Sequence, residues 1–281
     1  MSAPYFHGVY FAIRSASTYA VVVSLSYSAV TFVLTRLFHT VWCRSTSSVM
    51  PSRHHASCPF APAGHTVLMR MGPLLPDGIS SVEHVGVPRA VPLFPSEESA
   101  ISNAVPARRD EFAAARGCAR AALTDLGIGP VPVDSGPDRA PVWPLGVVGS
   151  ITHCEGYRAA AVGLSRSWAG IGIDAEVHAP LPPGILPLVA TSDEIADASR
   201  RVSDVCVDRV LFSAKEAVYK TWSPIMHTWL GFEDVYVILS RKTFIAHVAP
   251  SGLGTQALHG RWAVIDGLVL TAVTLEHSKE S

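Results

Sequence analysis

The acidic residues of this chain begin late, and this limits where its folded part can lie more than any other feature of the sequence. The chain has 281 residues with 23 Asp and Glu, and the first of these is Asp77. Five basic residues, all arginine, precede it, and the remaining 17 basic residues then accompany all 23 acids, a net charge of −6. Globular surfaces normally mix both signs of charge. We therefore expect a folded unit from about residue 71, preceded by an extension over residues 1–70.

Three interpretations of this extension stay open. Its apolar run, residues 19–34, is interrupted by Ser and Thr and falls short of a clean membrane-spanning helix. Its acid-poor, Arg- and Ser-rich composition also fits a targeting segment, so the first interpretation is a membrane or targeting segment. The second interpretation is a disordered leader. The third interpretation is that translation starts at Met69 or Met71, so that the preceding residues are an over-extended gene start. The chemistry of the later residues does not depend on this choice.

Composition places the chain among globular proteins, with 48% hydrophobic and 16% charged residues. The five cysteines are scattered and include no C-x-x-C pair, which argues against a disulfide framework and against a structural zinc site. A reducing cytoplasm is therefore the expected compartment. We expect a monomer whose partners include neither nucleic acid nor a membrane.

Two segments predict strong helices. Residues 106–126 open with proline, continue with an Ala-rich body and stop before Gly127. Residues 206–222 carry an apolar face and are expected to end at Ser223-Pro224, because proline interrupts the helical hydrogen bonds. These helices are the best candidates to present functional side chains.

Runs of apolar residues between turn signals predict strands at 146–154 and 169–177, and a strand or short helix at 157–165. A helix is expected from about Ser192, and three or four antiparallel strands fill the end of the chain. Residues 77–106 are expected to be loop-rich. Helices stand among strands without regular alternation, so the predicted fold class is α+β.

Two carboxylates stand one residue apart in AGIGIDAEVH, at the end of the predicted strand 169–177. Alternate side chains of a strand share a face, so Asp174 and Glu176 point the same way. Two anions this close repel each other unless a cation lies between them or one stays protonated. One interpretation is a strand that ends in a solvated loop. The other is a site for a hard cation such as Mg²⁺, which binds carboxylates together with water and phosphate.

A third carboxylate lies in LFSAKEAVYKTW, within the second predicted helix. Glu216 and Lys220 are four residues apart and share a helix face, as an ordinary surface ion pair would. The helix is otherwise apolar and should be largely buried, so a charged pair on it favours a functional role. Asp174, Glu176 and Glu216 together supply three oxygen ligands, and Lys220 is available for a phosphate.

Arginines gather on one side of the helix 106–126. Arg109, Arg116 and Arg120 fall within roughly 40° of one another at 100° per residue, and Arg108 is about 80° from Arg116. One interpretation is surface arginines whose head groups stay solvated. The other is a site for a polyanion, because Arg binds phosphate bidentately.

His153 follows a small-residue turn in GSITHC, as a core histidine or as a phosphate ligand and proton carrier. Cys154 suggests a thiol nucleophile, but no base and orienting partner can be assigned to it. G-x-x-x-x-G-K-[ST], G-x-S-x-G and H-E-x-x-H are all missing from the sequence. The commonest NTPase, hydrolase and zinc-protease interpretations are therefore excluded.

The segments GSITHC, GIDAE and FSAKEAVYK, in this order and spacing, resemble the motifs of the Sfp/EntD-type 4′-phosphopantetheinyl transferases. The likeness extends through RRDEFAAARGCARAAL, PVWPLGVVGS and WLGFEDV and covers about residues 75–275. It is strongest to the actinobacterial enzymes that activate the carrier proteins of polyketide, nonribosomal peptide, siderophore and fatty acid biosynthesis.

This resemblance implies two similar α+β halves, residues 71–169 and 170–281, related by a pseudo-two-fold, with coenzyme A in the cleft between them. It implies transfer of the 4′-phosphopantetheine group of coenzyme A to a serine of an apo acyl carrier protein or peptidyl carrier domain. The reaction would depend on Mg²⁺, with Mn²⁺ as the alternative, and would release adenosine 3′,5′-bisphosphate.

By similarity, individual residues take the roles of the family. The implied metal ligands are Asp174, Glu176, Glu216 and the backbone carbonyl of Ala175. The implied catalytic residues are Glu216 as general base, Lys220 on the phosphates, and His153. The implied coenzyme A contacts are Arg108, Arg116, Ser135, Asp138, Arg139, Thr152, His153, Asp174, Glu216, Lys220 and Leu230. The loop 134–141 lacks the lysines of close relatives, and Arg139 is the candidate to replace them.

The stretch TWSPIMHTWLGFEDV directly follows the residues of the second helix that carry the charges. Trp222 is expected in the core, whereas Met226, Trp229, Leu230 and Phe232 are too many for so short a segment to bury. We expect some of them to receive the pantetheine arm and the carrier protein, because such side chains are typical interface anchors. The alternative is that they cover the sheet of the second half.

Two rival functions use the same residues. A Mg²⁺-dependent nucleotide phosphohydrolase needs the carboxylates but no protein acceptor. A non-catalytic module would bind coenzyme A or a carrier protein without chemistry.

Overall fold

The computed structural model describes residues 9–11, 23–25, 69–88, 91–136, 139–249 and 257–277. The chain divides into two units, Met1–His65 and Thr66–Ser281. In the first unit, the described residues form β1 (Val9–Phe11) and β2 (Val23–Leu25), which pair antiparallel. Most residues on which the interpretations of the extension depend lie outside the described ones. Within the described ranges, no helix combines the length and the apolar character needed to cross a membrane.

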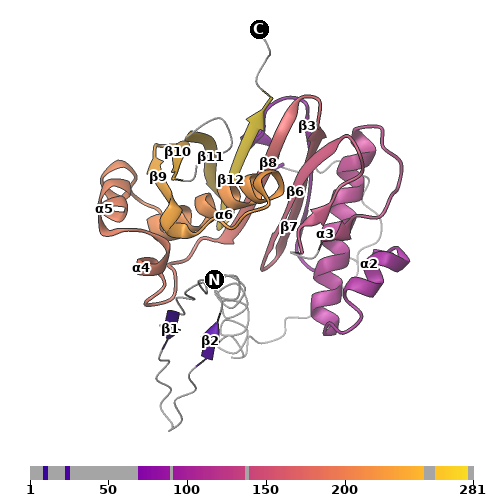
Figure 1. The fold of residues 1–281 in the computed structure, drawn as a ribbon, viewed down its shortest axis with the longest axis horizontal. Coiled ribbons are helices and arrows are strands. Elements are labelled where there is room, and N and C mark those ends of the chain that lie inside the picture. The colour runs from indigo at the N-terminus through magenta and orange to yellow at the C-terminus, as the bar shows by residue number, and fades with distance from the viewer. Residues whose placement is uncertain are drawn as a thin grey trace, which may run out of the picture. The chain divides into compact units, whose positions relative to one another are not determined.

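The second unit mixes helices and antiparallel sheets, as the predicted α+β class requires (Figure 1). Its helical elements are η1 (Gly72–Leu74), α2 (Pro95–Ala100), α3 (Pro106–Asp125), α4 (Leu186–Val189), α5 (Ser192–Arg201), α6 (Val207–Met226) and η2 (Phe232–Asp234). Its strands are β3 (Ile79–Val85), β4 (Asp134–Ser135), β5 (Pro141–Val142), β6 (Val147–Cys154), β7 (Tyr157–Leu164), β8 (Trp168–Val177), β9 (Val235–Leu239), β10 (Thr243–Val248), β11 (Ala257–Ile265) and β12 (Leu268–Glu276).

The second unit is built around two antiparallel sheets. One has the strand order β3-β7-β6 and the other β8-β12-β11-β10-β9, while β4 and β5 form a short ribbon. Helix α3 packs on the first sheet and α6 on the second (Figure 1). One core cluster, with Ala119, Leu123 and Val162, fills the space under α3. A second cluster, which includes Tyr157 and Leu270, joins the two sheets.

Strands β6 and β8 are neighbouring edge strands of the two sheets, and hydroxyl groups connect them. Ser150 Oγ accepts a hydrogen bond from the Ile173 N–H at 3.1 Å, and Thr152 Oγ1 accepts one from the Ala175 N–H at 3.0 Å. These side chains satisfy backbone amides that an adjacent strand would otherwise pair. We call this line of contact between β6 and β8 the seam.

Glycine lets α6 lie close against β8. A Cβ atom at Gly172 would overlap the carbonyl oxygen of Ala217 and the side chain of Thr221, both on α6. A larger residue would therefore push the helix away from the strand. The small residue in GIGID thus sets the distance between the strand and the helix that carry the predicted carboxylates.

The structure extends one sequence-based expectation and corrects another. Residues 77–106 are loop-rich, as expected, but they also contain β3 and α2. Strand β3 was missed because its sequence ISSVEHV lacks an apolar alternation and none of its residues is fully buried; pairing along β7 defines it instead. Helix α6 also continues through Pro224, whose fixed φ is compatible with a helix. It ends at His227, in the left-handed conformation (φ 52°), whose N–H donates to the Ser223 carbonyl.

The remaining elements agree with the sequence. Residues 157–165 form the strand β7 rather than a short helix, and four antiparallel strands, β9 to β12, end the chain. Helices α3, α5 and α6 begin within a residue or two of the predicted positions.

Candidate active site

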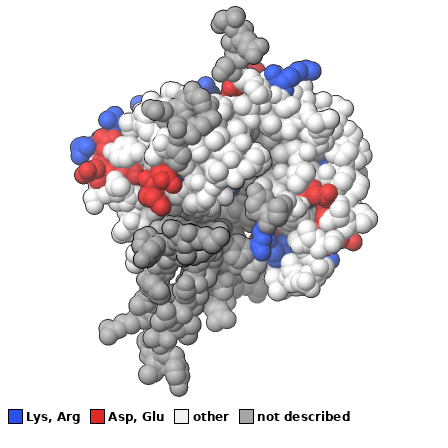
Figure 2. All heavy atoms as spheres, viewed as in Figure 1, with Lys and Arg blue, Asp and Glu red and all other residues white. Residues whose placement is uncertain are grey.

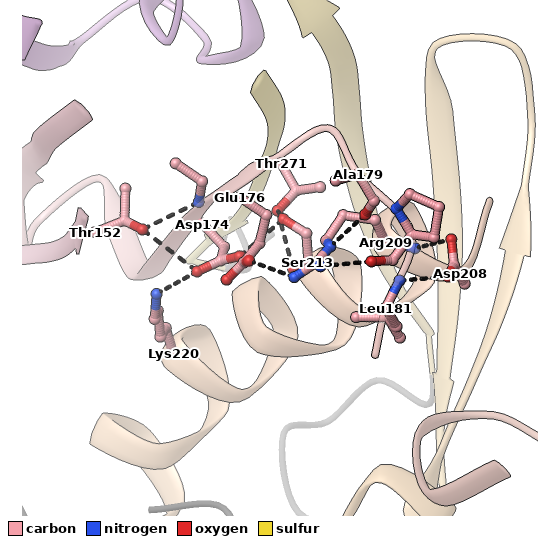
Figure 3. Close-up of polar contacts among 12 residues, drawn as sticks. Thr152, Asp174, Glu176, Ala179, Leu181, Asp208, Arg209, Ser213, Lys220 and Thr271 are labelled. Carbon is pink, nitrogen blue, oxygen red and sulfur yellow. Dashed lines mark hydrogen bonds and ion pairs between the residues drawn. The ribbon is translucent and has the colours of Figure 1, made fainter. Parts of the chain in front are cut away.

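Four polar residues form a stripe along α6, and three of them, Arg209, Ser213 and Lys220, point to the end of β8 in Figure 3. Arg209, Ser213, Glu216 and Lys220 are spaced by four, three and four residues, which places them on one side of a helix. The rest of this helix is largely apolar and buried. The stripe therefore brings one anion, two cations and a hydroxyl to the carboxylates of β8.

Asp174 is buried and accepts hydrogen bonds from three side chains. Its Oδ1 accepts from Lys220 Nζ at 2.6 Å and from Thr152 Oγ1 at 3.3 Å, and its Oδ2 accepts from Ser213 Oγ at 2.8 Å (Figure 3). The donors come from β6 and from two turns of α6. Asp174 thus ties the seam to the helix, and the contact with Lys220 makes it an ion pair.

Glu176 also has a cationic partner, Arg209, which donates from Nη1 to Oε2 at 2.9 Å (Figure 3). Burial raises the pKa of Glu176 to about 8, and the negative charge of Asp174 adds to this rise while Arg209 opposes it. Each of the two carboxylates of β8 therefore has one cationic partner. The sequence analysis missed Arg209, although its spacing of seven residues from Glu216 places it on the same side of the helix.

Glu216 is partly buried, and burial raises its pKa to about 7. Asp174 raises this pKa further and Lys220 lowers it. Among the described residues, none forms a hydrogen bond with the Glu216 carboxylate. Asp174 raises the pKa of both Glu176 and Glu216, and Glu216 raises that of Glu176, so the structure brings the three predicted carboxylates together.

Lys220 is held by the same group of residues. Burial disfavours its charge, but Asp174 and Glu216 raise its pKa above the ordinary value. Besides Asp174 Oδ1, its ammonium donates to the Ile173 carbonyl at 3.2 Å. Lys220 is therefore a firmly placed cation at the seam.

The carboxylates suit a hard cation by their chemistry, because oxygen ligands of high negative charge are what Mg²⁺ binds. As they stand, however, no three His, Cys, Asp or Glu side chains in the described part of the chain are arranged to hold a metal ion. Two of the three carboxylates are bonded instead to Lys220 and Arg209. A cation would share these oxygens with, or take them from, the two side chains.

A second polar group joins α3 to β6. Arg108 Nη1 donates to His153 Nε2 at 2.7 Å, and it lies 3.5 Å from Glu111. The Arg108 side chain is 46% exposed, so this pair is accessible to a ligand. The structure thus brings together two residues that the sequence assigned to a phosphate.

The other arginines of α3 have different surroundings. Arg116 is buried, donates to Ser135 Oγ at 2.9 Å and lies over the ring of Phe112. Burial lowers its pKa to about 10. Arg120 instead forms an ion pair with the buried Glu97 at 2.8 Å. The predicted polyanion cluster is therefore divided, and Arg120 serves the packing of α2 against α3.

The remaining predicted residues lie apart or outside the described chain. Asp138 is outside the described residues, and Arg139 adopts a left-handed conformation with φ 67°. Trp222 is buried, as expected. Leu230 is buried too, which corrects the idea that it forms a surface anchor, whereas Trp229 is 38% exposed and lies against Tyr219.

Cys154 does not have the environment of a nucleophile. It is buried, and burial raises the pKa of its thiol far above the ordinary value, with Glu176 and Asp174 adding to the effect. Reactive cysteines have lowered pKa values, because the thiolate is the nucleophile. The thiol interpretation is therefore not supported.

A mixed helix-and-sheet unit with buried carboxylates, a lysine among them and an accessible Arg–His pair defines a candidate enzyme for an anionic substrate. Comparison with known proteins gives its family. Residues 96–163 match the family model of the 4′-phosphopantetheinyl transferase N-terminal domain, and residues 170–273 match that of the 4′-phosphopantetheinyl transferase superfamily. The chain belongs to this superfamily and is a phosphopantetheinyl transferase, which confirms the resemblance seen in its motifs.

Three relatives support this assignment. The chain is 42% identical to the 4′-phosphopantetheinyl transferase Npt of Nocardia iowensis over 71% of its own length and 97% of the relative. It is 42% identical to PptT of Mycobacterium tuberculosis over 67% of this chain and 88% of the relative. It is 45% identical to Svp of Streptomyces mobaraensis over 65% and 78%.

Proposed function

We propose that this chain transfers the 4′-phosphopantetheine group of coenzyme A to a serine of apo acyl carrier proteins and peptidyl carrier domains. Adenosine 3′,5′-bisphosphate is the second product. The observation that carries the proposal is the group formed by Asp174, Glu176, Glu216 and Lys220 at the seam. The comparisons do not favour the rival phosphohydrolase or a non-catalytic module.

A divalent cation fits the proposed chemistry. Asp174, Glu176, Glu216 and the backbone carbonyl of Ala175 would hold Mg²⁺, with Mn²⁺ as an alternative. When bound, the cation neutralises negative charge on the pyrophosphate as its bond breaks. Burial is the main cause of the raised pKa values of Glu176 and Glu216, and the negative charge of Asp174 adds to both, so a cation bound among these carboxylates would stabilise their charged forms.

The residues of the chain supply positioning and proton transfer. Lys220 binds the phosphate oxygens of coenzyme A. Glu216 accepts the proton of the carrier serine while the serine oxygen bonds to phosphorus and the adenosine 3′,5′-bisphosphate leaves. A pKa of about 7 suits a general base that acts near neutral pH.

Coenzyme A would lie in a cleft between two similar halves, residues 71–169 and 170–281, with its phosphates toward the seam. Arg108, His153 and Thr152 bind the 3′-phosphate. Their support is the Arg108–His153 contact and the place of Thr152 next to Asp174. The adenine side is assigned to Arg116 and Ser135, which already contact each other. Arg139 and Asp138 complete that side.

One assay tests the function. The purified chain is incubated with coenzyme A, Mg²⁺ and an apo carrier protein, and the carrier is weighed by mass spectrometry. A phosphopantetheine-sized increase on the carrier supports transfer, and nucleotide cleavage without that increase supports the phosphohydrolase. Binding without reaction would leave the non-catalytic module. We further expect a cytoplasmic monomer, which light scattering and cell fractionation can check.

A further inference from the structure

We propose that Arg209 is a positioning residue that fixes the Glu176 carboxylate for binding a divalent cation. This inference rests on the proposed function, because it takes Glu176 to be a ligand of that cation. Arg209 does not contact the reacting groups itself in this assignment. It acts through Glu176 alone.

Arg209 donates three hydrogen bonds that hold its guanidinium in one orientation, and we call this arrangement the fork. The residue is 5% exposed and lies in the first turn of α6. Its Nε donates to the Ala179 carbonyl at 2.9 Å, its Nη2 to the Pro180 carbonyl at 3.0 Å, and its Nη1 to Glu176 Oε2 at 2.9 Å (Figure 3). A planar guanidinium with three acceptors in fixed directions cannot rotate without losing hydrogen bonds. The position of Nη1, and through it that of Glu176 Oε2, is therefore set by backbone.

The fork leaves one oxygen of Glu176 for a ligand. Oε2 is occupied by Arg209, whereas Oε1 has no hydrogen-bond partner among the described residues. Glu176 is the more exposed member of the pair, with 24% of its side chain accessible against 6% for Arg209. A carboxylate held by one oxygen and open at the other is oriented in advance for a cation.

Charge alone predicts the opposite effect of Arg209. A guanidinium beside a cation site repels the cation, so its removal should tighten binding. Positioning predicts weaker binding after removal, because a freely rotating Glu176 must lose rotamer freedom to bind. The sign of the change in affinity therefore separates the two effects.

A neighbouring residue provides a matched control for general loosening of this region. Asp208 precedes Arg209 on α6 and accepts the Leu181 N–H at 2.6 Å, so it also anchors the segment after β8. Its carboxylate also accepts the backbone N–H of Arg209 at 2.8 Å but, unlike the Arg209 guanidinium, forms no hydrogen bond or ion pair with Glu176 in the described part of the chain. Asp208→Ala thus removes an anchor of the same segment without removing the Glu176 ion pair.

The test measures Mn²⁺ binding directly, by electron paramagnetic resonance of free Mn²⁺, in the full chain and in Arg209→Met, Arg209→Lys and Asp208→Ala. We expect Arg209→Met to weaken Mn²⁺ binding by about 10- to 100-fold, the range found when partners of metal ligands are removed. Arg209→Lys keeps the charge but not the fork, and should lose part of the affinity. Asp208→Ala should leave it unchanged.

Other results would overturn the inference. Equal or tighter binding by Arg209→Met means that the guanidinium acts only as a repelling charge. An equal loss in Asp208→Ala means that the segment, not the fork, sets the affinity. If Arg209→Met does not fold, Arg209→Lys decides, and unchanged affinity there refutes positioning. A wild-type chain that binds no Mn²⁺ removes both the metal site and this inference, whereas binding without transfer refutes only the proposed function.

Discussion

At the residue scale, the site is a set of charges held in pairs. Asp174 is paired with Lys220, and Glu176 with Arg209, while Glu216 has burial and electrostatic neighbours but no hydrogen bond within the described chain. Most of the described surface on one side of the molecule is uncharged, apart from patches such as the mixed one over α5 (Figure 2). The Asp174–Lys220 and Glu176–Arg209 ion pairs instead lie at the seam, with 6% of the Asp174 and of the Arg209 side chain exposed. Because Asp174 accepts several hydrogen bonds and Glu216 accepts none from a described residue, we expect substitutions of these two residues to differ in their effect on stability.

Glu216→Gln should abolish transfer and leave the fold intact. The amide has nearly the same size, and no hydrogen bond to a described residue is lost. Loss of a metal ligand and base should lower turnover by about 10²–10³-fold or more, as for removal of one group that stabilises a transition state. Carrier mass and the melting temperature are the two measurements. Near-wild-type turnover at saturating Mg²⁺ would contradict the assignment.

Asp174→Ala should also abolish transfer, but with a cost in stability. It removes the acceptor that Lys220, Ser213 and Thr152 share. Lys220 keeps the Ile173 carbonyl and Ser213 keeps Thr271 Oγ1, so the expected cost is that of about one buried unsatisfied group, about 1–3 kcal/mol. The sequence alone gave no reason to expect this difference from Glu216. Equal melting temperatures of the two variants would show that water replaces the missing acceptor.

At the element scale, the glycines of β8 allow α6 to lie close to this strand. The polar stripe of α6 faces the carboxylates at the end of β8. Gly172 is the closest point of approach. The positions of both elements were predictable from the sequence, because α6 has a strong helical pattern and β8 is a continuous apolar run. The ion pair between Glu176 and Arg209 was not, because it depends on the distance and rotation of the helix over the strand. Strand β3 escaped prediction for a related reason: backbone pairing with β7, not an apolar pattern, defines it.

Gly172→Ala should destabilise the protein by about 1–3 kcal/mol, the usual cost of an extra methyl group in a packed interior. The new Cβ would overlap α6 and displace the stripe, so transfer should fall as well. Gly129→Ala is the control, since a Cβ there meets no atom within 4 Å. Denaturant unfolding of the two variants measures the difference. A Gly172 variant as stable as the control would mean that α6 shifts without cost.

The segment after α6 provides a second prediction at this scale. Trp229→Ala should raise the KM for carrier protein with little change in melting temperature, because this side chain is 38% exposed and contacts Tyr219. Leu230→Ala should lower the melting temperature instead, since Leu230 is 4% exposed. Steady-state kinetics with varied carrier, beside thermal melts, separate the two. An unchanged KM in Trp229→Ala would place the carrier surface elsewhere.

At the scale of the whole molecule, the folded unit is anchored at its start by Glu83. This buried carboxylate accepts from the N–H groups of Arg70 and Met71, from the Arg70 side chain and from the Tyr157 hydroxyl. Met71 is fully buried, whereas Met69 is 41% exposed. The sequence placed the boundary near residue 71 from the distribution of acids alone. It could not show that residues 70 and 71 belong to the core, because that depends on their contact with β3 and β7.

Deletion of residues 1–68 should therefore leave both transfer activity and melting temperature essentially unchanged. Deletion of residues 1–71 should lower the melting temperature, because Glu83 then loses most of its donors and the core loses Met71. Thermal melts and the carrier mass assay on the two truncated proteins test this. A large drop already in the shorter deletion, or its insolubility, would assign the extension a part in the fold.

The hydroxyl contacts across the seam bear on whether the protein aggregates when it unfolds. Edge strands present unpaired backbone groups that can recruit other chains into intermolecular sheets. Here β6 and β8 cover each other, and Ser150 and Thr152 occupy two of the amides that would otherwise be available. If heat or mild denaturant parts the two sheets before either one melts, both edges are uncovered together. A chain opened in this way would aggregate rather than unfold reversibly. The seam therefore also protects the protein against aggregation.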